Sequence, residues 1–521
     1  MTKQTTRMAA AFALAVFMFA GNSFAAVNVA VNATGSSGMF NLAALGGFSA
    51  NVCGTNIWTQ KSSSSAPIEG VDQRPGGGPV QTGNIWVIWN TAKTTACVYL
   101  TVDSTVGNQM FFAVPKYTLS IASSLSGAAG ANLIPTLTDV ALDPTIFTAI
   151  NNQPFNCAMT DVRPEDALFE ENRVLGALDP IGYTGLGYGP PPVGTPILST
   201  FSTKSATPVL FALSGTDPIS GGTVPAWTTR AVGAEPVVVF VNTQDTTSGG
   251  FGSTNFENIS RFDLANVLNG TLTRTRDIAN LPNLPSVGIQ TILREPLSGT
   301  YTTMEFNVPR NQEINSSQEL NVNPGATGGN PLDIVYASGG TRKRAIGTGE
   351  MVSEVGKIQD AFGYAFWSTG NFAGVLTTTK YLSVDGVDPI NYHWLLSRGV
   401  FPNCIYPCKG LIPFPNILNG SYPIWTILQV AANLPFPQGV KALIANAQTQ
   451  ALNGFPDFVP VSSLQVFRSH FDRPEELTPA SNGNPGEPAE SGGSVGGAVF
   501  SVQSDLDNFT DTGLQLLGGK Q

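Results

Sequence analysis

The stretch Arg294-Glu295-Pro296-Leu297-Ser298-Gly299-Thr300 separates a strand-like apolar run at 287–293 from the next element, which starts at 301. An arginine after a strand, followed by Ser-Gly-Thr at a helix start, is typical of an anion site. The guanidinium offers a planar fork of donors that matches an oxyanion. The hydroxyls and free N–H groups of the first helical turn add more donors, and glycine lets the backbone come close. The alternative interpretation is an ordinary helix N-cap preceded by an exposed arginine.

Residues 1–25 have the pattern of a secretory signal peptide. Lys3 and Arg7 precede an apolar run at 8–20, and Ser23-Phe24-Ala25 fits the small residues of a cleavage site. We therefore expect cleavage near Ala25 and a periplasmic or secreted protein. No other apolar run in the sequence is long enough to span a bilayer.

The composition indicates a large protein with many turns. Its 521 residues are enough for two domains with full cores. Charged residues make up 12%, beside 56 Gly and 37 Pro, which indicates long ordered loops rather than long charged helices. The net charge of -10 argues against a nucleic-acid partner. Local dipoles and one arginine can still build an anion site in an acidic protein.

The five cysteines of an exported chain predict disulfides. Cys404 and Cys408 are close enough in sequence to pair locally, and a bond between Cys53 and Cys97 would close the segment between them. Cys157 lies in an apolar strand-like run, so we expect a buried thiol there. The two histidines lie far apart and near no cysteine pair, so neither a metal site nor a cofactor is expected.

Three further strand ends run into polar turns. The turn at 34–40 follows an alternating strand at 27–32, the turn at 103–108 follows a buried strand at 97–102, and the turn at 160–166 follows a strand at 155–159. The last turn places Asp161 just before a helix that starts at Pro164, where open α/β sheets bind ligands. The alternatives are a plain strand-to-helix turn and, for Asp161, an N-cap.

Strands and helices alternate through most of the chain, which predicts an α/β architecture with mainly parallel sheets. Residues 53–95 carry little periodicity and residues 183–230 are rich in Gly, Pro, Ser and Thr, so both are predicted to be insertions. Apolar residues that recur on one face predict a helix around 440–451. Polar turns at strand ends in both halves suit a ligand held between two α/β lobes.

Eight segments share their order and character with one known family. They are TGSSGMF (34–40), DSTVG (103–107), TDVRPED (160–166), VGAEPVVVFVN (232–242), DLANVLNGTL (263–272), REPLSGT (294–300), GEMVSEVGKIQDAFGYAFW (349–367) and YLSVDGVDPI (381–390). The series resembles the periplasmic phosphate-binding proteins of ABC phosphate uptake systems. It extends over residues 27–390, and the last third of the chain matches weakly.

The resemblance implies a two-lobed periplasmic binding protein fold (type II-like), with loop-rich insertions, a C-terminal extension and a hinge that closes on one dehydrated phosphate. The first lobe would hold residues 26–231 and the second lobe residues 232–370. Residues 371–521 would return to the first lobe and add the extension, and more than one crossing strand would join the lobes. The expected partners are inorganic phosphate, or a similar tetrahedral oxyanion, and an ABC permease in the inner membrane.

The resemblance also assigns site residues. In the second lobe it assigns a guanidinium, two hydroxyls and a close backbone approach, which are Arg294, Ser298, Thr300 and Gly299. In the first lobe it assigns a serine, the cleft aspartate and two positions whose N–H groups face the ligand, which are Ser104, Asp161, Met39 and Phe40.

Three positions depart from the family's pattern. Met39 stands where the family usually has threonine, and Ser37 is the candidate to replace the lost hydroxyl. Pro296 stands where the family has an aspartate, and Glu295 is the candidate to orient the guanidinium instead. Arg163, where the family often has proline, either adds a cation or pairs with a neighbouring acid. These differences bear on affinity and on the choice of oxyanion more than on the fold.

A buried carboxylate at Asp161 has a chemical rationale. An ionised carboxylate can only accept hydrogen bonds, so it suits a protonated phosphate, which has an O–H to donate. Sulfate is fully ionised at neutral pH. An unpaired buried acceptor and a like charge together disfavour it by several kcal/mol, as an order of magnitude.

Three functions of different classes follow from the sequence. The first is an exported solute-binding protein that captures phosphate for ABC-type uptake. The second is an exported surface or structural protein that keeps the fold with weak or altered oxyanion binding, and the Gly/Pro/Ser-rich segments and low charge suit it. The third is an enzyme such as a phosphohydrolase. It ranks last because the sequence has no G-x-S-x-G elbow, no metal cluster and no histidine beside a nucleophile.

Overall fold

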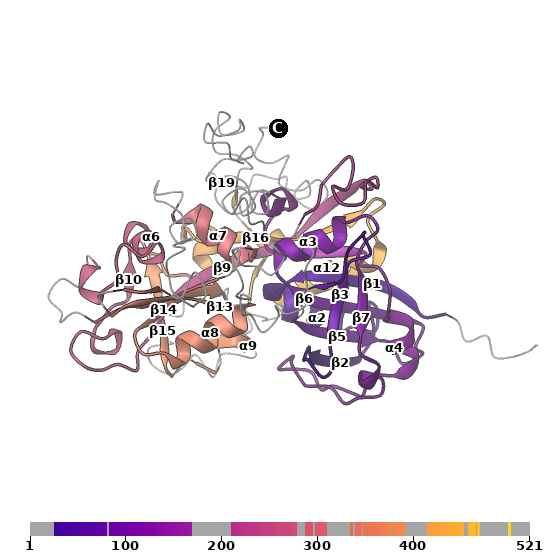
Figure 1. The fold of residues 1–521 in the computed structure, drawn as a ribbon, viewed down its shortest axis with the longest axis horizontal. Helices are drawn as coiled ribbons and strands as arrows, with labels where there is room; N and C mark the ends of the chain where they lie inside the picture. The colour runs from indigo at the N-terminus through magenta and orange to yellow at the C-terminus, as the bar shows by residue number, and fades with distance from the viewer. Residues whose placement is uncertain are drawn as a thin grey trace, which may run out of the picture.

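Two lobes lie side by side, with the N-terminal part of the chain in one and the middle of the chain in the other (Figure 1). The computed structural model describes residues 26–80, 83–168, 210–278, 287–294, 297–309, 334–336, 339–345, 347–372, 374–375, 377–390, 414–452, 457–464, 466–468 and 499–501. The expected signal peptide, the Cys404–Cys408 pair, residues 183–209 and most of the C-terminal extension lie outside these ranges, so those predictions stay predictions.

The first lobe is built on three parallel strands, β1 (Asn28–Ser36), β6 (Thr95–Val102) and β8 (Cys157–Thr160), with β1 in the middle. Their apolar side chains are almost all buried, as expected of parallel strands covered on both faces. Each of the three ends at one of the predicted polar turns. Since the carboxyl ends of parallel strands meet at one edge, the three turns come together there.

Helices cover both faces of these strands. On one face lie α2 (Phe40–Gly47) and α12 (Gln438–Leu452), which pack on each other around a shared apolar cluster. The predicted apolar face of α12 is confirmed, because Val440, Leu443 and Ala447 are buried in that cluster. The other face carries α3 (Ser104–Phe112) and α4 (Pro144–Ile150), which bury a second cluster.

Residues 53–95 hold more regular structure than the predicted insertion. They form β2 (Asn56–Lys61), β3 (Ile68–Val71), β4 (Pro79–Val80) and β5 (Asn84–Trp89). β5 pairs with β6 and β2 pairs with β5, so both extend the large sheet. Periodicity was a poor guide because five of the six residues of β5 are buried, which removes the alternation of polar and apolar side chains.

Two strands cross between the lobes, β9 (Trp227–Asn242) and β16 (Trp425–Asn433). The first half of β9 pairs with β16, and its second half pairs with β14 and β15 of the second lobe. Both crossing strands run antiparallel to every strand they pair with. The sheet is therefore mixed, and the prediction of mainly parallel sheets is wrong for its centre.

The second lobe contains the parallel strands β11 (Gln290–Arg294), β13 (Thr341–Ala345) and β14 (Ala361–Phe366), together with β15 (Thr379–Val384). Its apolar cluster includes Tyr381, Leu382 and Ile417, so this lobe extends past the expected boundary at 370. The chain returns to the first lobe along β16. The longer helices described in this lobe are α6 (Arg261–Leu268), α7 (Gly299–Asn307) and α8 (Gly347–Lys357).

The remaining described elements are short. They are η1 (Ser37–Met39), β7 (Thr118–Ile121), η2 (Ser123–Leu125), η3 (Phe251–Ser253), β10 (Asn258–Ile259), η4 (Thr275–Asp277), β12 (Ile334–Val335), α9 (Thr369–Phe372), α11 (Pro415–Leu418), β17 (Val459–Pro460), η8 (Val461–Ser463), β18 (Val466–Arg468) and β19 (Val499–Ser501). Among the described helices, none is long and apolar enough to cross a membrane.

The cysteines of the first lobe match their predictions. Cys53 and Cys97 form a disulfide, which ties the loop after α2 to the buried strand β6. Cys157 is a free, fully buried thiol on β8. Burial raises the pKa of this thiol to about 12, so the reactive thiolate is strongly disfavoured in the folded protein.

Replacing Cys53 and Cys97 by serine should lower the free energy of unfolding by about 2–4 kcal/mol, because cross-linking restricts the unfolded chain. The sequence separation of 44 residues makes the closed loop long. Urea unfolding without reductant measures the change. A reductant should bring the wild-type midpoint close to that of the double variant and leave the variant unchanged. Equal midpoints for the oxidised wild type and the variant would contradict the prediction.

Candidate functional site

The opening motif of the sequence forms a strand end, a turn and a helix start, as predicted. β11 ends at Arg294 and α7 begins at Gly299. Ser298 caps the helix, because its Oγ accepts a hydrogen bond from the Thr300 N–H at 3.2 Å. Glu295 and Pro296 lie outside the described residues, so the predicted role of Glu295 stays a prediction.

The turn before α7 is docked on the first lobe. Leu297 is fully buried and belongs to the apolar cluster around α3. The Thr105 N–H donates to the Leu297 carbonyl at 3.2 Å. One apolar and one polar contact therefore hold the anion motif of the second lobe against the polar turn at the start of α3.

Arg294 lies between the lobes and is 1% exposed. Its Nη1 donates to Thr300 Oγ1 at 2.9 Å and to Thr348 Oγ1 at 3.4 Å. Its Nη2 lies 3.8 Å from Oδ1 of Asp103, a first-lobe residue. The guanidinium is thus surrounded by hydroxyls of its own lobe and faces a carboxylate of the other.

Asp161 lies at the end of β8 and is 2% exposed. Its two carboxyl oxygens accept from the hydroxyls of Ser104 and Ser36, the latter at 2.9 Å. Burial raises the pKa of Asp161, and the two serine hydroxyls and the charge of Arg294 oppose that rise. The Thr426 hydroxyl of β16 donates to the Asp161 carbonyl at 2.6 Å, which ties this residue to a crossing strand.

The two halves of the site touch at Gly299. A Cβ atom at this position would stand 2.5 Å from Asp161 Cγ and 2.8 Å from Ser104 Oγ. The backbone of the second-lobe helix start therefore lies directly on the first-lobe aspartate. No side chain other than hydrogen fits here, which is the physical reason for glycine.

The turn after β1 contributes less directly than expected. Ser37 Oγ lies 3.3 Å from Thr348 Oγ1, so it does reach the second lobe. Met39 is fully buried in the first-lobe core. The Phe40 N–H, which the resemblance expects to face a ligand, donates to the Ser37 carbonyl and closes the short η1 turn. Arg163, the third departure from the family, pairs with Asp166 through Nε–Oδ2 at 3.0 Å.

Four residues of the site were not predicted. Ser36 and Asp103 directly precede the predicted residues Ser37 and Ser104, so the predicted turns themselves indicated this part of the sequence. Thr348 lies in the Gly-Thr-Gly that opens α8, a pattern which indicated a helix start but not its place near Arg294. Glu235 is an acid inside the apolar run of β9, and a charge in such a run was the available signal.

Glu235 is fully buried, and neither of its carboxyl oxygens has a hydrogen-bond partner in the described part of the chain. A Cβ at Gly38 would stand 3.1 Å from Glu235 Oε2 and 3.3 Å from Ser36 Oγ, so this carboxyl lies against the first-lobe turn. Burial raises the pKa of Glu235 well above its ordinary value, and the nearby carboxyls of Asp457 and Asp161 raise it further. The neutral form of the Glu235 carboxyl is therefore strongly favoured over the carboxylate.

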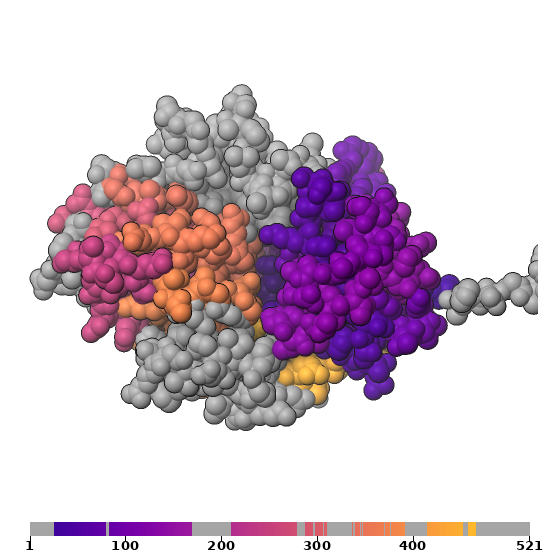
Figure 2. Space-filling view, turned by 90° about the horizontal axis from the view of Figure 1, so that it is seen from below, coloured from indigo at the N-terminus to yellow at the C-terminus, as the bar shows by residue number. Residues whose placement is uncertain are grey.

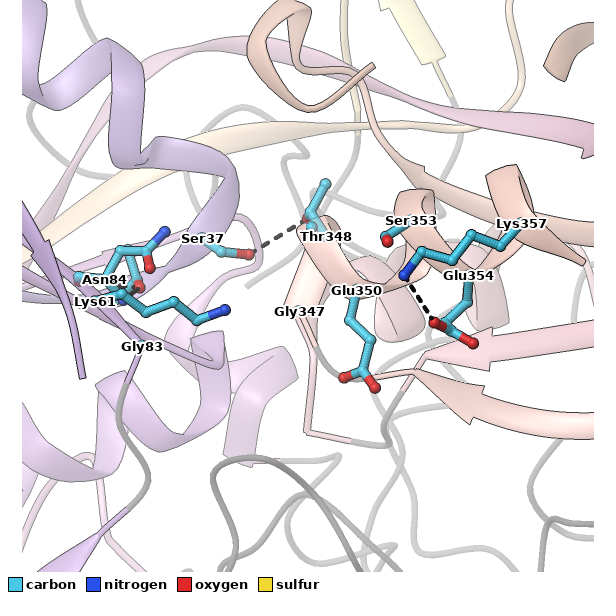
Figure 3. A pocket seen from close by; sticks show the side chains of 12 residues that line it. Ser37, Lys61, Gly83, Asn84, Gly347, Thr348, Glu350, Ser353, Glu354 and Lys357 are labelled. Atoms are coloured by element: carbon cyan, nitrogen blue, oxygen red, sulfur yellow. Dashed lines mark hydrogen bonds and ion pairs between the residues drawn. The ribbon is translucent and has the colours of Figure 1, made fainter. Parts of the chain in front are cut away.

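A cavity of 430 Å³ opens beside the site between the lobes. In Figure 3 the side chains of the two lobes face each other across it, and the hydroxyls of Ser37 and Thr348 meet at its edge. The space-filling view shows the two lobes meeting along a seam, with the first lobe in indigo and magenta and the second in pink and orange (Figure 2).

Gly299→Ala should destabilise the closed arrangement by about 1–3 kcal/mol, the usual cost of overpacking. Alanine favours the start of a helix over glycine, so propensity alone would stabilise the variant. The sign of the change in the free energy of unfolding therefore tests the contact with Asp161. Urea unfolding gives the free energy, and small-angle scattering should show a larger radius of gyration.

Gly374→Ala is the matched control, because a Cβ there has no atom within 4 Å. It should leave both the unfolding free energy and the radius unchanged. A Gly299→Ala protein that is as compact as the wild type and more stable would contradict the close contact.

Glu235→Gln should resist rising pH better than the wild type. The unfolded chain loses the proton of a glutamate near its ordinary pKa, about 4.3, whereas the folded protein holds it to higher pH. The stability due to this proton is full below about pH 4 and is lost as pH rises through the raised folded pKa. The amide does not titrate. The free energy of unfolding of the variant, relative to the wild type, should therefore increase as pH rises above about 4.

Urea unfolding at several pH values measures this difference. The partly exposed Glu354, which pairs with Lys357 at 3.5 Å, supplies the matched control Glu354→Gln. That control should stay within about 0.5 kcal/mol of the wild type across the range. A constant difference between Glu235→Gln and the wild type would contradict a proton held by Glu235.

No protein-family model matches this chain, and neither does any curated protein. Solved structures that are similar to it include a high-affinity periplasmic phosphate-binding protein, PfluDING, at 12% identity and a TM-score of 0.36, covering 82% of this chain and 90% of that one. A phosphate-binding protein from Stenotrophomonas maltophilia has 12% identity and a TM-score of 0.32, and the match covers 70% of this chain and 83% of that one. An ABC-type phosphate transport receptor from Vibrio cholerae has 13% identity and a TM-score of 0.26, and the match covers 43% of this chain and 68% of that one. Similarity this low leaves function to be argued from the residues of the site.

Proposed function

We propose that the protein binds inorganic phosphate in a closed site between its two lobes. The observation that carries the proposal is that Arg294 of the second lobe and Asp161 of the first are both almost fully buried at one interlobe contact. Arg294 Nη1 and the Asp161 carboxyl bond to hydroxyls in the structure, and a hydroxyl can turn toward a ligand. A ligand that carries negative charge and also has a proton to donate can bond to both groups at once.

The hydroxyls around the two charges fit the same ligand. Ser104, Ser298 and Thr300 are each at most 2% exposed. A hydroxyl can donate one hydrogen bond while it accepts others. Ser104 donates to Asp161, and Thr300 accepts from Arg294. Small rotations about χ1 would turn these hydroxyls toward oxygen atoms of a tetrahedral ion held between the two charges.

Asp161 gives the site its selectivity. As a carboxylate it accepts the O–H of a protonated phosphate and repels sulfate, which has no proton to give. As a neutral acid it would donate a hydrogen bond and accept either ion. Because burial raises its pKa, the preference for phosphate over sulfate should strengthen as pH rises through that value.

The cellular role follows from export. A secreted protein that closes on phosphate serves uptake when it releases the ion to a membrane permease. We propose an ABC permease as this partner. The competing interpretation, a surface protein with weak or altered oxyanion binding, differs in affinity rather than in fold.

Isothermal titration of phosphate-stripped protein tests the proposal. Phosphate and arsenate should bind to the wild type, and sulfate should bind at least about a hundredfold more weakly, which corresponds to roughly 2.8 kcal/mol. Asp161→Asn should weaken phosphate and reduce the discrimination against sulfate by about tenfold, because an amide can donate as well as accept.

Asp277→Asn, on a partly exposed residue of the second lobe, is the matched control and should bind like the wild type. Equal affinity for sulfate and phosphate in the wild type would show that the role given to Asp161 is wrong. If neither anion binds, the surface-protein interpretation takes the lead.

A further inference from the structure

We propose that the interlobe cavity beside Arg294 holds the hydroxylated organic part of a phosphate monoester, so that the protein takes such esters as well as inorganic phosphate. This inference rests on the proposed anion site and extends it. Both lobes build the cavity, with Ser37, Lys61 and Asn84 from the first and Thr348, Ser353 and Lys357 from the second (Figure 3).

The size of the cavity exceeds what a single oxyanion needs. A water molecule takes about 30 Å³ in the liquid, so a tetrahedral ion takes on the order of two to three times that volume. The cavity measures 430 Å³, which lies within the range of about 300–1,000 Å³ that is typical of small-molecule sites. Room is left for a substituent of several heavy atoms.

The cavity and the anion site share one wall. Thr348 Oγ1 lies 3.4 Å from Arg294 Nη1 on the side of the anion site and 3.3 Å from Ser37 Oγ at the edge of the cavity. Both separations are at the long end of the hydrogen-bond range, so both bonds are weak. An ester whose phosphoryl group meets Arg294 would separate these two hydroxyls, and hydrogen bonds to its bridging oxygen would replace their weak contact.

The lining of the cavity indicates the chemistry of the substituent. Its twelve residues are all described, and every side chain among them ends in a hydroxyl, amide, ammonium or carboxylate group. Carbon atoms of the glycines and of the side-chain stems supply the larger part of the surface between these groups. A substituent of carbon alone would leave the polar groups that it shields from water without partners, at about 1–3 kcal/mol for each group. A polyol or sugar fits both kinds of surface, because it has C–H groups and also hydroxyls that donate and accept.

The charges of the lining favour a substituent without charge. Lys61 and Lys357 are balanced by Glu350 and Glu354, and Lys357 Nζ lies 3.5 Å from Glu354 Oε1. A second phosphate in the cavity would meet two carboxylates as well as two ammonium groups. The structure thus favours a monoester of a neutral polyol over a bisphosphate.

Isothermal titration at about pH 6, where a phosphate monoester is half protonated, tests the inference on the full mature chain. Glycerol phosphate should bind, and phenyl phosphate, an apolar monoester, should bind at least about tenfold more weakly. Glycerol alone should not bind. Ser353→Trp fills the cavity and should lower the affinity for glycerol phosphate by about tenfold or more. The affinity for inorganic phosphate should change by less than about twofold.

Ser124→Trp, at an exposed residue of η2 in the first lobe, is the matched control and should change neither ligand. If inorganic phosphate binds and glycerol phosphate does not, the inference fails and the proposed function stands, because the cavity is then merely the entrance. Equal effects of Ser353→Trp on both ligands would also overturn the inference. If neither ligand binds, the proposed function fails and the inference fails with it.

Discussion

The site depends on one contact, in which the turn before α7 is anchored in the first lobe. Leu297 is buried in the first-lobe cluster that includes Val106, and its carbonyl accepts from the Thr105 N–H. This contact fixes where α7 starts, so Gly299 lies on Asp161. Without it the two charges, which belong to different lobes, would be held apart by water, where their attraction is screened. An apolar side chain thus sets the distance between two buried charges.

The crossing strands link that contact to the connection between the lobes. The Thr426 hydroxyl on β16 donates to the Asp161 carbonyl, and Glu235 on β9 lies opposite Thr426 in the sheet register. Both crossing strands therefore reach the first-lobe side of the site. A bend of this two-stranded connection would change the surroundings of Asp161 and Glu235 together, so such a bend would be coupled to the protonation of these carboxyls.

The sequence predicted features that depend on local chemistry. The Ser298 cap, the apolar face of α12 and the Cys53–Cys97 bond follow from residue type and spacing, and the structure has all three. Features that depend on distant pairing were missed. The strand β5 within 53–95 carries no alternation because it is buried on both faces. The place of Thr348 beside Arg294 follows from α8 packing near β11. The sequence around Glu235 does not distinguish a buried acid at the site from a charged residue on an exposed edge strand.

The balance of charges limits how the proposed site could hold an anion. Arg294 supplies one positive charge, Asp103 lies 3.8 Å away, and Asp161 adds a second carboxyl. The local charge is therefore no better than neutral, in a protein whose net charge is -10. Net attraction cannot drive binding under these conditions. What remains is a set of buried hydroxyls and one buried guanidinium, and directed hydrogen bonds are stronger in such surroundings than in water. A site that binds through directed donors and acceptors distinguishes ligands by where their protons are, and in the proposed function Asp161 is the group that would make this distinction between phosphate and sulfate.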